Sequence, residues 1–207
     1  MLAAAIVLCA SLPAQTTASA APTPTPLAAA RTFHDPAYHF SFNYPANWTF
    51  SHTDREISTF HLDALTAPPS ARLRAVAAMP ENPFPDSTFS GAYVYLSVTP
   101  HSSAAACARQ ATRTAIVKNI PQISAGTPAQ IAGIAFTHGH DEVKDVCITQ
   151  HDEVYTTRRA GDCLRVDLAI NNFCSEVSGA RDITSTQLAQ VRARLESILQ
   201  TLRFDGK

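Results

Sequence analysis

The densest group of side chains that could do chemistry consists of His138, His140, Asp141 and Glu142, and the segment His151-Asp152-Glu153 follows it closely. Imidazole nitrogens and carboxylate oxygens can together hold a divalent metal ion. The two histidines lie two residues apart in a polar segment, and we interpret residues 138–142 as a charged, solvated turn. His138, His140 and Asp141 are therefore only weak metal candidates, and we assign no metal or other cofactor.

No motif for a catalytic nucleophile or a bound nucleotide occurs in the sequence. The chain has no G-x-S-x-G pattern, and Ser90-Gly91 lacks the partner glycine. Glycine patterns for phosphate or dinucleotide binding are also missing. Asp152, Glu153 and Asp167 could pair in space, but strand spacing alone does not select them, and we interpret them as surface charges. We assign no catalytic residue.

The cysteines predict two disulfide bonds. Beyond Cys9 the chain holds Cys107, Cys147, Cys163 and Cys174, and an even number in an exported chain favours disulfides, with three possible pairings. A zinc site is a rival interpretation, which the lack of any C-x-x-C pair disfavours. Four free buried thiols in a reduced protein are the other rival.

We favour the pairs Cys107–Cys163 and Cys147–Cys174. The first would join a central helix to a strand of a hairpin. If Ala160-Gly161 is a two-residue hairpin loop, Cys147 and Cys174 lie equally far from it and face each other. A three-residue loop ending at Gly161 would shift this register, and Asn171-Asn172 could end the pairing earlier.

The elements that must position these residues are strands in two groups, each followed by a helix. Side-chain patterns predict strands over 57–65, 73–78, 92–98, 130–138, 146–158 and 164–170, with Gly133 as a bulge or a close-packing point. One helix is predicted from Ser102 or Ser103 to about Lys118. The other covers residues 184–202, begins with a Thr184–Gln187 capping box and has an apolar face at helical spacing. This order indicates an α+β domain rather than alternating βαβ units.

Residues 38–50, YHFSFNYPANWTF, predict the structural corner of this domain. Tyr38, Phe40, Phe42 and Tyr44 alternate with polar residues, which is typical of a strand with one buried face. Pro45 ends this strand because it has no N–H to donate, and Trp48 opens the next one. We expect the core to pack on Phe40, Phe42, Tyr44, Pro45 and Trp48.

The pattern F-x-F-x-Y-P-x-x-W formed by these core residues resembles the PsbP-like superfamily. That group includes the photosystem II extrinsic protein, the Mog proteins and many bacterial secreted proteins. The helix that runs into residues 198–204 adds a second likeness, because such domains often end in a helix and a short aromatic-bearing strand. The resemblance covers residues 32–207 and implies an antiparallel β-sheet flanked by helices, an αβα sandwich. It also implies an accessory or binding role, although a fold alone does not specify a function.

The N-terminus predicts export. Residues 1–20 contain an apolar run too short to span a bilayer and an A-x-A pattern at Ala18-Ser19-Ala20, as in a cleaved signal peptide. No Lys or Arg precedes the run, so either the true start lies upstream or export is weakly specified. Lipidation at Cys9 and a cytosolic protein with an apolar N-terminus are the alternatives. The Thr- and Pro-rich residues 21–31 predict an extended linker, which leaves 32–207 as one domain in the periplasm or outside the cell.

Charge and composition narrow the choice of partner. The formal net charge is −1 and no basic stripe or polybasic segment occurs, which argues against nucleic acid and anionic membranes as partners. We expect no transmembrane span in the mature chain.

The leading hypothesis is an exported, non-enzymatic accessory or binding domain with an unknown protein or small-molecule partner. A small-molecule or metal-binding periplasmic protein that uses residues 138–142 is one alternative, and a concave apolar pocket beside them would favour it. A hydrolase with dispersed catalytic residues is the other. It requires a histidine within hydrogen-bond reach of a buried serine or carboxylate.

Overall fold

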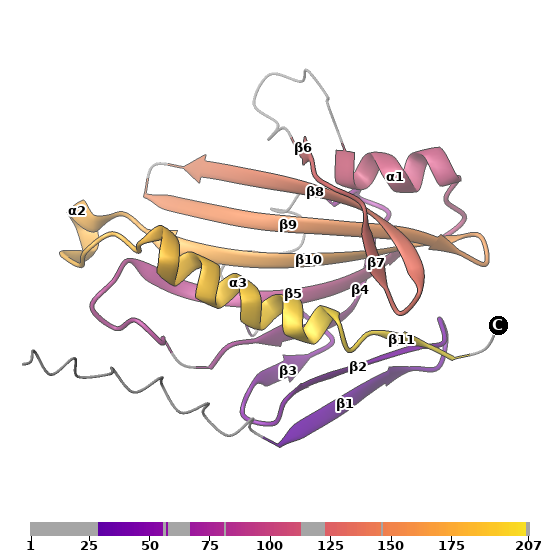
Figure 1. Ribbon diagram of the computed structural model, residues 1–207, viewed down its shortest axis with the longest axis horizontal. Coiled ribbons are helices and arrows are strands. Elements are labelled where there is room, and N and C mark those ends of the chain that lie inside the picture. Colours follow the sequence, from indigo (N-terminus) through magenta and orange to yellow (C-terminus); the bar gives the residue numbers. More distant parts are fainter. Residues whose placement is uncertain are drawn as a thin grey trace, which may run out of the picture.

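An eight-stranded antiparallel sheet is the centre of the structure, a computed structural model that describes residues 29–55, 57, 67–80, 82–112, 123–145 and 147–205 (Figure 1). Its strand order is β3-β4-β5-β10-β9-β8-β6, and β7 pairs with β8 outside this path. The strands are β3 (Thr49–Ser51), β4 (Arg72–Ala78), β5 (Phe89–Thr99), β6 (Ser124–Ala125), β7 (Ala129–Ile131), β8 (Ile134–Asp145), β9 (Ile148–Arg159) and β10 (Asp162–Phe173).

A smaller sheet and three helices complete the described part. The small sheet has the order β1-β2-β11 and consists of β1 (Ala30–Asp35), β2 (Phe40–Pro45) and β11 (Arg203–Phe204). The helices are α1 (Ala104–Thr112), α2 (Ser175–Ser178) and α3 (Ser185–Leu199). The chain is thus mostly antiparallel sheet with a few helices. None of the described helices combines the length and apolar character needed to cross a membrane.

The large sheet has two covered faces, which we name after their helices. The α3 face carries α3 and the small sheet, whereas α1 packs on the opposite α1 face through the Cys107–Cys163 disulfide (Figure 1). Because side chains alternate along a strand, each central strand contributes to both faces. On β10 the α3 face receives Leu164, Val166, Leu168 and Ile170.

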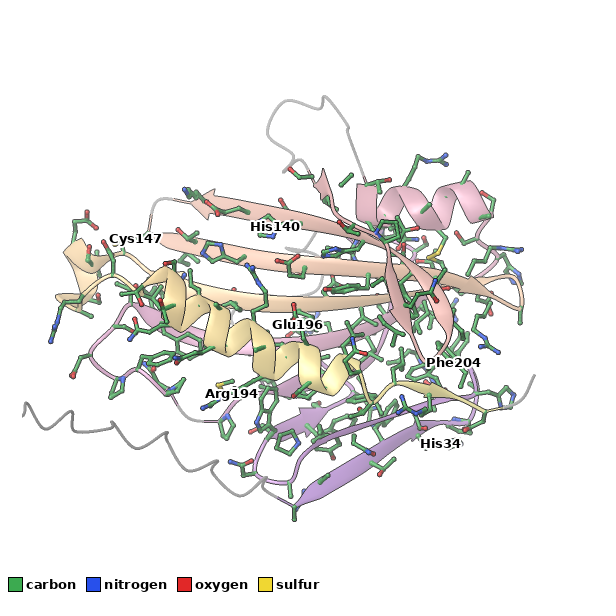
Figure 2. The ribbon with its side chains drawn as sticks, in the orientation of Figure 1. His34, His140, Cys147, Arg194, Glu196 and Phe204 are labelled. Atoms are coloured by element: carbon green, nitrogen blue, oxygen red, sulfur yellow. A yellow bond between two sulfur atoms is a disulfide. The ribbon has the colours of Figure 1, made fainter. Side chains whose placement is uncertain are left out.

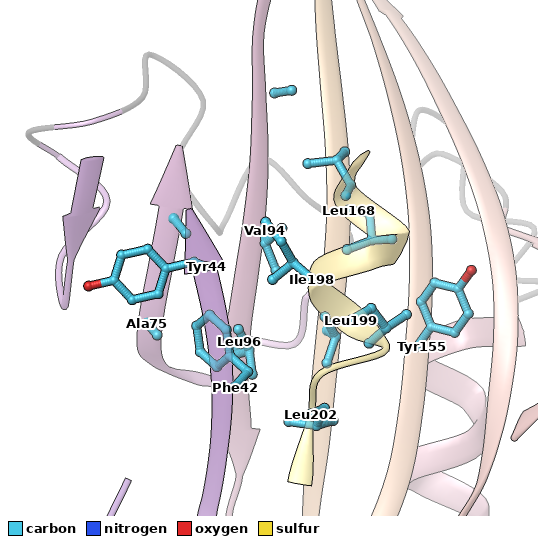
Figure 3. Close-up of a cluster of buried hydrophobic side chains, with 14 of the residues drawn as sticks. Phe42, Tyr44, Ala75, Val94, Leu96, Tyr155, Leu168, Ile198, Leu199 and Leu202 are labelled. Carbon is cyan, nitrogen blue, oxygen red and sulfur yellow. The ribbon is translucent and has the colours of Figure 1, made fainter. Parts of the chain in front are cut away.

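The main apolar core lies on the α3 face (Figure 3). Phe42 of β2, Leu96 of β5 and Leu199 of α3 are buried in one cluster, which also includes Trp48. Phe40, Phe42 and Tyr44 are buried while Asn43 is exposed, so the predicted alternation of this strand is confirmed. The aromatic corner therefore joins the small sheet to the large one.

Helix α3 begins as its sequence predicts. The side chain of Thr184 accepts a hydrogen bond from the Gln187 backbone N–H, and the Gln187 side chain accepts one from the Thr184 backbone. The helix ends at Leu199, and β11 then pairs with β2, which matches the expected short aromatic strand. Ser103 caps α1 through Ala106 N–H, and the predicted continuation to Lys118 lies outside the described residues.

The hairpin of β9 and β10 has the two-residue loop that the cysteine pairing requires. Ala160 and Gly161 have φ angles of 48° and 95°, and Arg159 faces Asp162 across the loop. The same register continues to Ile148 opposite Phe173 and places Cys147 beside Cys174. Both predicted disulfides are present, Cys107–Cys163 and Cys147–Cys174.

Two predictions about the middle of the chain are wrong. Gly133 is not a bulge, because Ala132 and Gly133, with φ angles of 52° and 75°, form the turn between β7 and β8. The segment 138–142 is not a turn either, since it lies within the twelve-residue strand β8. A run of polar residues suggested a loop, but in the strand these side chains alternate between the two faces of the sheet.

Three other predictions concern segments at the margins of the described structure. The leader, residues 1–20, and most of the predicted strand 57–65 lie outside the described residues. Most of the linker also lies outside them, and β1 begins at Ala30, before the expected domain boundary.

Candidate functional site

Strand β8 separates the candidate ligands onto opposite sides of the sheet. His138, His140 and Glu142 point to the α3 face, where His138 and His140 contact Glu153 of β9. Asp141 points to the α1 face and is only 2% exposed. His138, His140 and Asp141 therefore cannot bind one metal ion together. Among the described residues, no group of three or more His, Cys, Asp or Glu side chains has the arrangement of a metal site.

The α3 face carries instead a row of paired charges, which we call the histidine–glutamate ladder: His138, His140, Glu142, His151 and Glu153. Figure 2 labels one of its members, His140. The centre of the ladder is the Glu153 carboxylate. One oxygen lies 2.8 Å from His138 Nε2, and the other lies 3.0 Å from His140 Nδ1 and 3.1 Å from Arg192 Nε of α3. A second group of contacts, which we call the second rung of the ladder, is centred on Glu142: its carboxylate lies 3.2 Å from His151 Nδ1 and 2.7 Å from Lys144 Nζ.

Neighbouring donors and positive charges favour the ionised form of the two ladder carboxylates, Glu153 and Glu142. Burial by itself raises the pKa of Glu153, but the hydrogen bond from His138 and the charge of Arg192 lower that pKa overall. The hydrogen bond from Lys144 lowers the pKa of Glu142. Burial lowers the pKa of His151, because it disfavours the charged imidazolium. The ladder is thus held as an ordered set of ionic and hydrogen-bonded pairs.

The ring of His138 also has a fixed orientation. It stacks on Tyr155 with a centroid distance of 4.4 Å and an interplanar angle of 8°. Burial, followed by the charge of Glu153, raises the pKa of the Tyr155 hydroxyl further above its ordinary value. This stacking leaves His140 and Arg192, whose side chains are each 37% exposed, as the most accessible members around Glu153.

An open groove of about 360 Å³ adjoins the second rung of the ladder. Glu142 and His151 line one side, and Ile183 and Leu188 line the other beside the start of α3. The Cys147–Cys174 disulfide lies next to α2 at the same end of the molecule, where Cys174 also borders the groove (Figure 2). The wall of this groove is mixed polar and apolar rather than apolar.

The ladder meets one requirement of the hydrolase alternative. His138 and His140 both lie within hydrogen-bond reach of a carboxylate that is only 7% exposed. In the described part of the chain, however, neither ring is hydrogen-bonded to a serine, threonine or cysteine side chain. The histidines therefore have a carboxylate partner but no bonded nucleophile there.

The α1 face holds a buried charged cluster that the sequence did not reveal. Asp152, Glu153 and Asp167 are not surface charges, because their exposed fractions are 1%, 7% and 0%. Asp167 and Asp152 lie on the α1 face with Arg165, which is also completely buried. The sequence did contain a signal for this burial. Arg165 and Asp167 alternate with apolar residues on a strand at the centre of the sheet, where both faces are covered.

Comparisons with known proteins return structures rather than families. No family model and no curated protein matches the chain. The solution structure of cyanobacterial PsbP (CyanoP) from Synechocystis aligns with 89% of this chain and 98% of its own, at 12% identity and a TM-score of 0.47.

Two crystal structures give lower scores. A protein from Bacteroides thetaiotaomicron covers 85% of this chain and 48% of its own, at 12% identity and a TM-score of 0.42. LpqN of Mycobacterium tuberculosis, which is involved in cell envelope biogenesis, covers 84% and 89%, at 13% identity and a TM-score of 0.39. Because these three TM-scores are below 0.5, the three likenesses do not assign the chain to a family.

Proposed function

We propose that the chain is an exported, non-enzymatic binding domain that contacts its partner through the histidine–glutamate ladder and the adjoining groove. The observation that carries the proposal is the ladder itself: its side chains are paired, stacked and half-buried on a sheet face beside α3. Such pre-ordered polar groups lose little conformational entropy when a partner binds.

Binding explains this arrangement better than catalysis does. The Glu153 carboxylate already receives contacts from His138, His140 and Arg192, so its charge is compensated in the unbound domain. A general base, by contrast, needs a proton donor on the substrate or nucleophile within reach. The ladder is therefore suited to recognising a polar surface.

Export and a PsbP-like fold belong to the same proposal. The predicted signal peptide supports export, and the two disulfides are typical of an oxidising compartment. The aromatic strand with its Pro45 corner and the terminal strand β11 support the family resemblance.

Site-specific photo-crosslinking tests the binding surface. The full chain would carry a photoreactive amino acid in place of His140, or in place of the exposed Asn47 on the distant corner as a matched control, in its exporting host. We expect a discrete crosslinked product from position 140 that is absent from position 47 and lost in a His140 probe that also carries Glu153→Gln. Equal products at both positions, or none at position 140, would contradict the proposal.

A small-molecule ligand in the groove is the second candidate, favoured by the 360 Å³ groove beside Glu142 and His151. A thermal-shift screen of polar metabolites against the full chain tests it. A ligand that raises Tm for the native chain but not for Glu142→Gln would support this candidate, and a screen without any such ligand would remove it.

A further inference from the structure

Buried polar atoms without partners gather on the α1 face of the sheet. Within the described structure, those on the α1 face are Ser97, Gln110, Asp141, Gln150, Asp152, Thr156 and Asn171, whereas Asn172 and Arg192 are examples on the α3 face. Buried polar groups in folded proteins are normally hydrogen-bonded, so a concentration of exceptions on one face needs a physical explanation.

Two of these side chains are carboxylates that face each other directly. Asp141 and Asp152 are opposite partners in the register of β8 and β9, on the same face, and are 2% and 1% exposed. Asp141 Oδ1 and both carboxylate oxygens of Asp152 have no hydrogen-bond partner in the part of the chain that the structure describes. Like charges in directly opposed positions repel, and burial removes the water that would screen them.

The guanidinium of Arg165 mainly compensates a third carboxylate, that of Asp167. Arg165 Nε lies 2.8 and 2.9 Å from the two oxygens of Asp167, and Arg165 Nη2 also donates to Asp167. The same Nη2 is 4.0 Å from Asp152 Oδ2. Two further ionisable groups are on the same or a packed element: His140 is next to Asp141 but on the opposite face of β8, and Arg109 of α1 is exposed. Among the described residues, the buried cluster thus sets three aspartates against one arginine.

We propose that Asp141 and Asp152 together hold one proton in the folded domain at neutral pH, which makes the α1 face a proton-binding site. One proton on this pair removes the repulsion between two full charges in directly opposed positions. This proton-binding site lies on the opposite face from the ladder and is separate from the proposed binding function.

The electrostatic surroundings agree with this assignment. Burial, followed by the charge of Asp167, raises the pKa of Asp152 well above its ordinary value; the charge of Asp141 adds a smaller contribution in the same direction, and Arg165 opposes them. Burial also raises the pKa of Asp141. A raised pKa in the folded state means that the stabilisation is complete below the ordinary Asp pKa of about 4 and is lost as the pH rises through the folded value.

The cluster is connected to helix α1, which gives proton release a structural consequence. Arg165 Nη1 donates a hydrogen bond of 3.2 Å to the carbonyl oxygen of Gln110. The end of α1 also lies so close to β8 that a Cβ on Gly139 would come within 1.7 Å of the Ala111 carbonyl oxygen. A second full charge on the Asp141–Asp152 pair competes for Arg165, so α1 should loosen from the sheet at high pH.

Urea unfolding of the full, disulfide-bonded chain between about pH 5 and pH 9 tests the proposal. The variants are Asp152→Asn and Asp141→Asn, and the matched controls are their neighbours on the other face, Glu153→Gln and Glu142→Gln. We expect the ratio of unfolding constants, native over Asp152→Asn, to rise at least about tenfold across this range, equivalent to one unit of pKa. The controls should not show such a rise. Parallel pH curves for the native chain and Asp152→Asn would overturn the proposal.

Infrared spectroscopy of the native chain keeps the proposal testable if the asparagine variants do not fold. A protonated-carboxyl band should persist in the folded chain at pH 7, and hydrogen exchange in α1 should become faster at about pH 9, beyond the intrinsic effect of hydroxide. A folded chain without that band at pH 7 would refute the shared proton, and the crosslinking result at the ladder would stand independently.

Discussion

Along β10 both faces of the large sheet are buried, but different interactions stabilise them. On β10, Leu164, Val166 and Leu168 pack against α3, whereas Cys163, Arg165 and Asp167 on the same strand lie under α1. The α3 face gains stability by removing apolar area from water. The α1 face has smaller apolar clusters, such as Ala111, Ile123 and Val154, and combines them with a disulfide, an ion pair and the proposed proton on its acids. Burial alone therefore does not tell which chemistry stabilises a surface.

Two consecutive residues on opposite faces show the same difference in their pKa shifts. Asp152 and Glu153 are consecutive on β9, yet burial and Asp167 raise the pKa of Asp152, while His138 and Arg192 outweigh burial and lower the pKa of Glu153. The difference arises because alternate side chains of a strand point to opposite faces. The partners that each face provides determine the sign of the shift.

Trp48→Ala should give the largest effect on the α3 face. Trp48 is 8% exposed in the apolar core, and its truncation should lower the free energy of unfolding by about 3–5 kcal/mol. Urea unfolding measures this, with the exposed Val177→Ala as control, for which we expect less than about 0.5 kcal/mol. A Trp48→Ala variant that melts like the native chain would remove the aromatic corner from the core and weaken the family resemblance.

Arg165→Ala should cost a comparable amount on the α1 face, for an electrostatic reason. Its removal leaves Asp167 buried without its guanidinium partner, which should lower the free energy of unfolding by about 3–5 kcal/mol. The double variant Arg165→Met/Asp167→Leu should recover part of this loss, because the Asp167 carboxylate is removed together with its partner, while the charge left on the Asp141–Asp152 pair loses the nearby guanidinium. The exposed Arg109→Ala on α1 is the control. If the double variant is less stable than Arg165→Ala, the ion pair contributes more than compensation of charge.

The two disulfides should differ in accessibility more than in stabilisation. The loop-entropy model gives each bond about 3.5–4 kcal/mol, with the larger value for Cys107–Cys163 because of its longer loop. Cys107 and Cys163 are buried on the α1 face, whereas Cys147 and Cys174 are half-buried at the end of the hairpin. Mild reduction followed by alkylation and mass spectrometry should therefore label Cys147 and Cys174 first. Simultaneous labelling of all four cysteines would show that both bonds open together.

Glu153→Gln should have the smallest effect and a defined pH dependence. The folded pKa of Glu153 is lowered, so its stabilisation is present above the ordinary Glu pKa of about 4.3 and is lost as the pH falls through the folded value. We expect a cost of about 1–2 kcal/mol at pH 7 that disappears in acid, measured by urea unfolding. A cost that grows in acid would mean that the His138 and His140 contacts do not stabilise the carboxylate.

Several local features could be predicted because neighbouring residues determine them. The Thr184–Gln187 capping box started α3, the alternation at Phe40, Phe42 and Tyr44 gave a buried strand face, and Ala160-Gly161 defined the hairpin register. The Cys147–Cys174 pair follows from that register, since positions equally far from a two-residue loop face each other. Each of these features depends on contacts that the local sequence already contains.

The sequence by itself determined an α+β chain with an aromatic corner, a capped terminal helix and a cysteine pattern for two disulfides. Only the tertiary structure decided that residues 138–142 form a strand, that His138 and His140 share Glu153 while Asp141 points away, and that Asp152 and Asp167 are buried. The physical reason is that the fate of a polar side chain depends on what covers its face of the sheet. That cover comes from α1, α3 and neighbouring strands that lie far away along the chain.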